Sequence, residues 1–268
     1  MNEKVVGIEF SKGALNALKY ASLLAKGFKC KITMLWVDKP FNPDSVYIDG
    51  ENFREGIHKR FAELIEEYTP VVGKDNIQYK IRTGKVYDEI ATYAKLNKCR
   101  FVVIGTHGIS GFEELWIGSN ANRVVSISPC PAFTLRQDFL VPDAVRRIIV
   151  PIDRTAETEL KVPFAIDIAK AFNAEIVLMK LYATNVPLLK KKVDDIADDI
   201  CDKLAKEKIK VSVVEKIVVN ITSDVLSVIE KNDADLLVIM TEQQTRSANI
   251  LLGEMAQQLV NNSPVPVL

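Results

Sequence analysis

Short apolar runs alternate along this 268-residue chain with segments whose apolar positions recur at three- and four-residue steps. The runs predict buried strands, and the recurring steps predict amphipathic helices. In the first half, the predicted strands are Lys4–Ile8, Lys31–Val37, Ile77–Ile81, Phe101–Ile104 and Ala132–Leu135. The helices predicted between the first four strands lie within residues 14–25, 52–68 and 88–96, with Gly27 and Pro70 ending the first two. Strands that alternate with helices indicate a mostly parallel sheet covered by helices.

The second half of the chain repeats this order. Its predicted strands are Arg147–Asp153, Glu175–Met179, Lys210–Val214 and Asp235–Met240, with helices within residues 160–169, 188–206 and 223–229. The segment Ser263-Pro-Val-Pro266 echoes Ser128-Pro-Cys-Pro131, which precedes the last strand of the first half. Repetition at half the chain length predicts two similar domains, residues 1–137 and 145–268. Each is expected to be a doubly wound, Rossmann-like α/β domain with a five-stranded parallel sheet in the order 3-2-1-4-5.

This topology predicts where a ligand binds. In open α/β sheets, ligands lie beyond the carboxyl ends of the strands, at the point where the strand order reverses. In the first domain that point is between the first and fourth strands. Glu9 follows the first strand, and Gly105 begins the loop after the fourth.

A glycine-rich loop occupies the same place, with the spacing Gly105-x2-Gly108-x9-Gly118-Ser119 ahead of a predicted helix. Glycines let the backbone approach an anion closely, and the first N–H groups of a helix have no partner within it. Ser119 stands where a helix N-cap belongs, and its hydroxyl can also reach a phosphate oxygen. The loop therefore predicts a phosphate-binding site. The alternative is a loop whose glycines only supply positive φ angles.

Composition narrows the function classes. Apolar residues make up 48% of the chain, which is enough for real cores. Lys+Arg and Asp+Glu are equal at 35 each, so the charge gives no nucleic-acid footprint. No apolar run approaches the roughly 18 residues that span a bilayer, and the first residues have no signal-peptide layout. We therefore expect a cytoplasmic protein. Its four cysteines, without a CxxC pair, predict reduced thiols, and two histidines argue against a histidine-built metal site.

The second half departs from the first at the predicted site. Met240 replaces Gly105, Gln243 replaces Gly108 and Glu254 replaces Ser119, while Gly253 keeps the last glycine. Larger side chains crowd a phosphate, and a carboxylate at a helix N-terminus repels it. We expect the second half to keep the fold without a standard nucleotide site. The substitutions also suggest that the glycines are not required to build the fold.

The glycine spacing, the preceding Val-Val-Ile-Gly-Thr-His-Gly and the following Ser-Pro-Cys-Pro resemble the ATP-binding motif of the universal stress protein family. The resemblance extends over both halves and implies a tandem member of that family. It implies phosphate contacts at Gly105, Gly108, Gly118, Ser119 and Asn120, and adenine or ribose contacts at Gly7, Glu9, Val37 and Ile104. The family usually has an aspartate where this chain has Glu9, whereas the second half has the family-like Asp153.

The resemblance also implies that the fifth strands of the two domains pair, which makes the chain its own pseudo-dimer and covers two exposed sheet edges. The predicted function is a stress-response protein that binds ATP in its N-terminal domain as a sensor or regulator. Any Mg²⁺ would arrive with the nucleotide, and no catalytic or metal-ligating residues are assigned. The alternatives are a slow ATPase or nucleotidyl-transfer enzyme in the same cleft, and an interaction module that binds no nucleotide. A homodimer and an unidentified protein partner remain open.

Overall fold

The computed structural model describes residues 3–38, 50–106, 119–241 and 252–268. The first domain contains β1 Glu3–Gly7, α1 Lys12–Phe28, β2 Lys31–Asp38, α2 Gly50–Val72, β3 Ile77–Thr83, α3 Val86–Leu96, β4 Phe101–Gly105, α4 Ser119–Ile127 and β5 Ala132–Leu135. The second contains β6 Arg147–Ile152, the 3₁₀ helix η1 Ala156–Lys161, α5 Val162–Phe172, β7 Glu175–Tyr182, α6 Pro187–Lys206, β8 Val211–Ile217, α7 Ile221–Lys231, β9 Leu236–Leu237 and α8 Glu254–Asn262.

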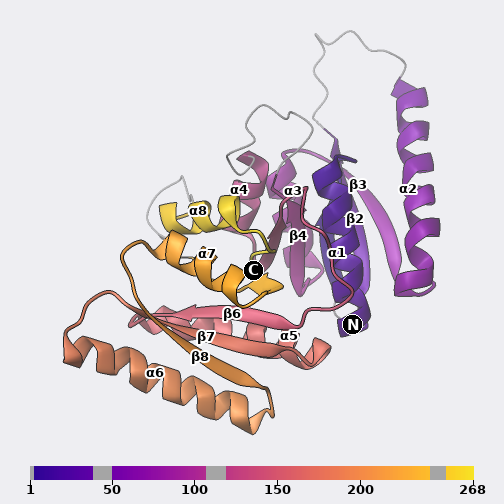
Figure 1. The fold of residues 1–268 in the computed structure, drawn as a ribbon. Coiled ribbons are helices and arrows are strands. Elements are labelled where there is room, and N and C mark those ends of the chain that lie inside the picture. Colours follow the sequence, from indigo (N-terminus) through magenta and orange to yellow (C-terminus); the bar gives the residue numbers. More distant parts are fainter. Residues whose placement is uncertain (1–2, 39–49, 107–118, 242–251) are drawn as a thin grey trace.

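Both sheets are parallel, and helices cover both faces of each (Figure 1). The first sheet has the order β3-β2-β1-β4-β5, which confirms the predicted topology. The second has the order β8-β7-β6-β9, with β9 far shorter than the predicted strand. In the fifth position, Val267 forms only an isolated parallel bridge to Leu237.

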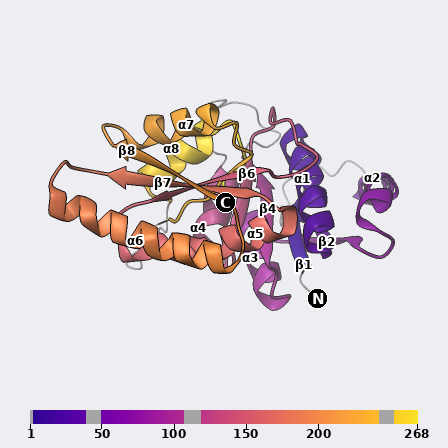
Figure 2. The ribbon, with the colours of Figure 1, turned by 60° about the horizontal axis from the view of Figure 1, so that its bottom comes forward.

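The two domains join where the fifth strands were predicted to pair. Thr134 of β5 and Val267 form an antiparallel bridge, with N–H···O distances of 2.9 and 3.1 Å in the two directions. The bridge links the two sheets edge to edge, and Figure 2 shows the second domain lying across the first. One apolar core includes Leu18 of α1 and Ile168 of α5, and a second includes Val124 of α4 and Leu259 of α8. Each core therefore runs through both domains, as expected of an intrachain pseudo-dimer.

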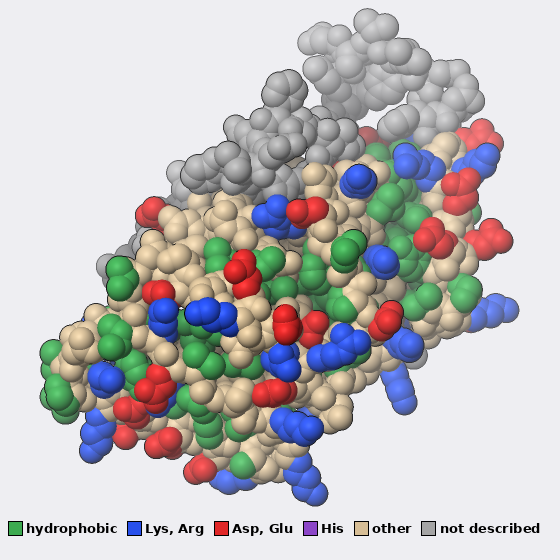
Figure 3. All heavy atoms as spheres, in the orientation of Figure 1, with side chains coloured by type: hydrophobic (Ala, Val, Ile, Leu, Met, Phe, Trp, Pro, Cys, Tyr) green, Lys and Arg blue, Asp and Glu red, His purple; other side chains and the backbone are tan. Residues whose placement is uncertain are grey.

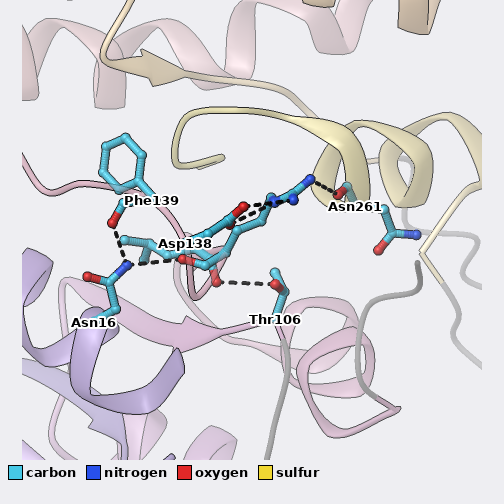
Figure 4. A network of polar contacts seen from close by, with 7 residues as sticks. Asn16, Thr106, Asp138, Phe139 and Asn261 are labelled. Atoms are coloured by element: carbon cyan, nitrogen blue, oxygen red, sulfur yellow. Dashed lines mark hydrogen bonds and ion pairs between the residues drawn. The ribbon is translucent and has the colours of Figure 1, made fainter. Parts of the chain in front are cut away.

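The segment after β5 is tied to both domains (Figure 4). The Asn16 amide of α1 donates to the carbonyl oxygens of Arg136, at 3.0 Å, and Phe139, at 2.8 Å. The Arg136 guanidinium pairs with Asp138 at 3.0 Å and donates to the Asn261 carbonyl of α8 at 3.3 Å. These bonds hold the connection between the domains against α1 and the end of α8.

The repeated Ser-Pro-x-Pro segments fold alike. The Ser128 hydroxyl donates to the Cys130 carbonyl at 2.6 Å, and the Ser263 hydroxyl donates to the Val265 carbonyl at 2.7 Å. In both turns the serine oxygen also accepts from the backbone N–H two residues on. The sequence echo is therefore a structural one, and it places both fifth-strand segments at the joint.

Two predicted helix ends are wrong. Gly27 lies inside α1, which ends at Phe28. Its C-cap is Lys29, a residue in the left-handed region with φ of 50° whose N–H donates to the Ala25 carbonyl. A Cβ at Gly27 would lie 2.5 Å from the Phe172 ring of α5, so this glycine serves packing between the domains. Pro70 lies inside α2, in its last turn, where a proline removes only one backbone hydrogen bond.

Lys4 of β1 is fully buried. Its Nζ donates to the Cys30 Sγ at 2.9 Å and lies 4.5 Å from the centre of the Phe28 ring. Burial lowers the pKa of Lys4 from 10.5 to about 8, although Cys30 opposes the shift. Between these two values the unfolded chain binds a proton that the folded chain does not. The contribution of Lys4 to the free energy of unfolding therefore rises as the pH increases from about 8 to 10.5.

Lys4→Met is expected to raise the free energy of unfolding by about 1–3 kcal/mol at pH 7, because it removes a buried charge and keeps the volume. Urea unfolding at pH 7 and pH 9.5 measures the effect, and the advantage of the variant shrinks at the higher pH. Lys19→Met, on the exposed side of α1, is the matched control and changes little. A Lys4→Met protein less stable than the wild type at pH 7 would contradict this reading.

Candidate functional site

The carboxyl ends of three neighbouring strands bring together the residues predicted to contact adenine and ribose. A Cβ at Gly7 would lie 3.5 Å from Ile104 Cγ2, which places the ends of β1 and β4 in contact. Gly7 also pairs with Leu35 of β2, so Val37 projects two residues beyond that pair. Ile104 is buried and Val37 is half-buried. The structure thus places Gly7, Val37 and Ile104 at one edge of the sheet, at the switch point.

Glu9 follows β1 at the same edge. Its Oε1 accepts a hydrogen bond from the Ser11 hydroxyl at 2.5 Å. Burial raises the pKa of Glu9, and hydrogen bonds from Ser11 and from its own backbone N–H oppose that shift. Ser11 is also the N-cap of α1, because its oxygen accepts from the Ala14 N–H at 3.1 Å. The start of the helix therefore fixes the hydroxyl that orients the carboxylate.

The second domain builds the same acid–hydroxyl pair. The Asp153 Oδ1 accepts from the Thr155 hydroxyl at 2.6 Å and from the Thr155 N–H at 2.9 Å. Thr155 stands at the N-cap position of η1 without a side-chain capping hydrogen bond, whereas the Ser11 oxygen accepts from the Ala14 N–H of α1. Sequence reasoning identified both acids and missed both hydroxyl partners. A serine or threonine directly ahead of a helical pattern was the available signal.

Gly105, at the end of β4, lies directly against the start of α1. A Cβ at this position would be 2.7 Å from the Gly13 carbonyl carbon and 2.8 Å from its oxygen, both backbone atoms. Real Cβ atoms essentially never approach backbone this closely, so Gly105 is required by the packing of β4 against α1. The inference that the loop glycines are not needed to build the fold is wrong for Gly105. Its backbone still lies at the switch point.

Ser119 and Asn120 are exposed in the first turn of α4. Ser119 was predicted to be the N-cap, but it is the first residue of the helix itself. The first N–H groups of a helix have no acceptor within the helix, so they can donate to a ligand at its N-terminus. Gly108 and Gly118, the other two predicted phosphate contacts, lie outside the described residues.

Phe10 is a feature of this edge that the sequence did not indicate. Its φ of 59° is in the left-handed region, which is unusual for a bulky residue. Its ring centre lies 5.1 Å from that of Trp36 and 4.9 Å from that of Phe61, and the Arg60 guanidinium lies 4.3 Å over its face. These contacts hold the chain in a sharp bend directly between Glu9 and Ser11.

Other classes of site find no support among the residues that the structure describes. Within them, no group of three or more His, Cys, Asp or Glu side chains is placed to hold a metal ion. None of the helices in the described ranges has the length and apolar character of a bilayer-crossing segment. On the face drawn in Figure 3, acidic and basic side chains are interspersed, in keeping with the zero net charge of the sequence.

The comparisons with known proteins agree with the duplicated fold. The model of the universal stress protein family matches residues 1–136 and again residues 144–268. The curated universal stress protein YxiE of Bacillus subtilis is 25% identical over 146 residues, which are 50% of this chain and 99% of that protein.

One solved structure with a similar fold spans both halves of this chain. The crystal structure of a universal stress protein from Archaeoglobus fulgidus covers 99% of this chain, which covers 94% of it, with a TM-score of 0.74 and 18% identity. A universal stress protein solved in complex with cAMP covers 51% of this chain, which covers 98% of it, with 20% identity and a TM-score of only 0.42. Two family matches on two joined α/β domains lead to one conclusion: this chain belongs to the universal stress protein family and carries the family's domain twice.

Proposed function

We propose that the N-terminal domain binds an adenine nucleotide, ATP, and that the protein acts as a cytoplasmic stress sensor or regulator rather than as an enzyme. The observation that carries the proposal is the meeting of Gly7, Glu9, Val37 and Ile104 at the switch point, with the start of α4 following the glycine loop. Nucleotides bind in doubly wound sheets at this position.

Each group has a role that fits a nucleotide. The half-buried Val37 supplies apolar surface for the adenine and packs against the buried cluster that contains Ile104, while the Glu9 carboxylate accepts hydrogen bonds from the ribose hydroxyls. The first N–H groups of α4, with the Ser119 hydroxyl and Asn120, face the phosphates. The predicted contacts of Gly105, Gly108 and Gly118 complete the cradle, and Mg²⁺ would accompany the phosphates.

Nucleotide binding would also regulate the protein directly. A ligand that binds only the folded state stabilises it by mass action, by about 2.7 kcal/mol at a hundred times its Kd. Each of the two apolar cores contains residues of both domains. Stabilising the N-terminal domain therefore also affects the stability of the second domain. The concentration of ATP would then set how long the protein persists under stress.

Glu9→Gln tests the nucleoside end of the proposed site. We expect the affinity for ATP to fall about tenfold at pH 7.5, since a hydrogen bond to a charged group is worth about 1.5–3 kcal/mol. Because the pKa of Glu9 is raised, the wild-type carboxylate gains its proton at a higher pH than an ordinary glutamate. The difference between wild type and variant should therefore narrow as the pH falls toward 5. Calorimetric titration at both pH values measures it.

The matched control is Glu63→Gln, an exposed glutamate of α2, which should bind ATP as the wild type does. Equal affinity of Glu9→Gln and wild type would remove Glu9 from the site. Absence of any binding by the wild-type protein at millimolar ATP would overturn the proposed function itself.

A further inference from the structure

The second domain contains a cavity of about 800 Å³ at its own switch point. Its walls come from the ends of β6 and β7, from η1, and from α6, α7 and α8. The cavity lies in the half that was expected to lack a standard nucleotide site, and a volume of this size holds a small organic ligand. We refer to it as the C-terminal cavity.

The origin of the cavity lies in one replacement. In the first domain, α1 begins three residues after Glu9 and its backbone touches Gly105. The second domain has Met240 at the position of Gly105, and a side chain there is incompatible with such an approach. The α-helix α5 begins only at Val162, with the 3₁₀ helix η1 before it. Met240 and residues of η1 both line the cavity.

A buried cation lies in the wall of the C-terminal cavity. Lys161, the last residue of η1, is 6% exposed, and its Nζ donates to the Thr158 hydroxyl at 3.0 Å. Within the described part of the chain, the Thr158 hydroxyl is the one hydrogen-bond acceptor of this ammonium, which has three protons to donate. Burial lowers the pKa of Lys161 to about 8, and Asp153 opposes the shift. The ammonium therefore has fewer hydrogen-bond acceptors among the described residues than it has protons. An anion in the cavity would accept further hydrogen bonds from it and balance its charge.

The rest of the lining defines the chemistry of the ligand. Most of the wall is aliphatic, including Leu181, Val193, Val225, Ile239 and Leu259. Among the described residues of the lining, three basic and two acidic side chains leave an excess of one positive charge: Arg154, Lys161, Lys190, Asp153 and Glu157. An apolar body with one negative charge matches this lining. A polyphosphate does not, because Met240 occupies the glycine position and Glu254 lies at the start of α8.

We propose that the C-terminal cavity is a second ligand site, which binds a small organic anion with an aliphatic body and a single carboxylate, and that the Lys161 ammonium is its counter-ion. This site is independent of the nucleotide site proposed in the N-terminal domain. The duplicated cleft has therefore changed its ligand class through the replacement at Met240 and the placement of Lys161 at the end of η1.

Octanoate and octan-1-ol are the probes, because they share an apolar tail and differ in charge. Calorimetry on the full chain should show one octanoate site, at least tenfold tighter than that for octan-1-ol at pH 7. Binding requires the protonated lysine, whose population falls about tenfold between pH 7 and pH 9 for a pKa near 8, so affinity should fall by the same factor. Other titratable groups face the same space from neighbouring elements: Asp153, Arg154, Glu157, Tyr182 and Lys190.

Three variants separate Lys161 from those groups. Lys161→Met should lose at least tenfold in octanoate affinity at pH 7 and lose the pH dependence. Lys161→Arg keeps a charge that does not titrate, so it should bind octanoate with little change between pH 7 and pH 9. Lys170→Met is the matched control on α5, where the exposed lysine pairs with Glu207, and it should behave as the wild type does.

Two results would overturn the proposal. One is octanoate binding no tighter than that of octan-1-ol, and the other is octanoate binding that Lys161→Met leaves unchanged. Displacement of octanoate by ATP would also overturn it, because the two ligands are assigned to different domains. If the wild-type protein binds octanoate as predicted but does not bind ATP, only the proposed function of the N-terminal domain is contradicted.

Discussion

Gly105→Ala is expected to lower the free energy of unfolding by about 3 kcal/mol, the upper end of the usual cost of overpacking. The added Cβ would meet two backbone atoms of Gly13, at 2.7 and 2.8 Å, and the Ala14 nitrogen at 3.1 Å. Backbone cannot rotate away as a side chain can, so α1 or β4 must move. Urea unfolding followed by tryptophan fluorescence measures the loss, because both tryptophans of the chain, Trp36 and Trp116, belong to the first domain.

Gly56→Ala is the control for this substitution. Gly56 is exposed within α2, and a Cβ there meets no atom within 4 Å. Alanine in a helix is favoured over glycine by about 0.5–1 kcal/mol, so this variant should gain stability. A Gly105→Ala protein as stable as the wild type would show that α1 adjusts freely, and would remove the packing explanation for the C-terminal cavity.

Gly118→Asp is expected to reduce ATP affinity at least a hundredfold. Gly118 is the last glycine of the predicted phosphate cradle, immediately ahead of Ser119 at the start of α4. A carboxylate at this point would repel the phosphates and satisfy the helix N–H groups in their place. The measurement is calorimetric titration with ATP, with far-UV circular dichroism to check that the variant is folded.

The chain supplies its own matched control for that variant in Gly253→Asp. Gly253 is the N-cap of α8 and exposed, and a Cβ there meets no neighbouring atom. Aspartate is a good N-cap residue, so this variant should fold well and bind ATP as the wild type does. If both aspartate variants bind ATP normally, the glycine loop does not hold the phosphates.

The arrangement of the strands was predictable from sequence because each rule involved is local. Alternating strands and helices dictate a parallel sheet with right-handed crossovers. The repeated Ser-Pro-x-Pro segments marked both sides of the domain joint, which the bridge between Thr134 and Val267 confirms. The position of Glu9 at a strand end followed from the same pattern, since a polar residue ended an apolar run.

The features that escaped prediction depend on contacts between distant segments. Gly105 meets Gly13, 92 positions earlier in the chain, and sequence gives no sign of that approach. Gly27 was assigned to a helix end, but it accommodates Phe172 from the other domain. Lys161 lies in a short segment with Glu157, Thr158 and Glu159 and resembles any surface lysine in sequence, although it is 6% exposed.

The duplicated half also shows how one replacement has two consequences. In sequence, Met240 indicates the loss of a phosphate site. In the structure, Met240 occupies the position that corresponds to Gly105, whose lack of a side chain lets the start of α1 pack against β4 in the first domain. In the second domain, Met240 lines the C-terminal cavity. The two halves thus share a fold and an acid–hydroxyl pair, while their clefts differ in shape and charge.

The central claim is that the chain has one nucleotide site, in its N-terminal domain. Native mass spectrometry of the full-length protein with excess ATP tests it most directly, because it counts bound nucleotides per chain. One ATP per chain, lost in Gly118→Asp and retained in Gly253→Asp, is the predicted result. Two ATP per chain, or none, would contradict the claim.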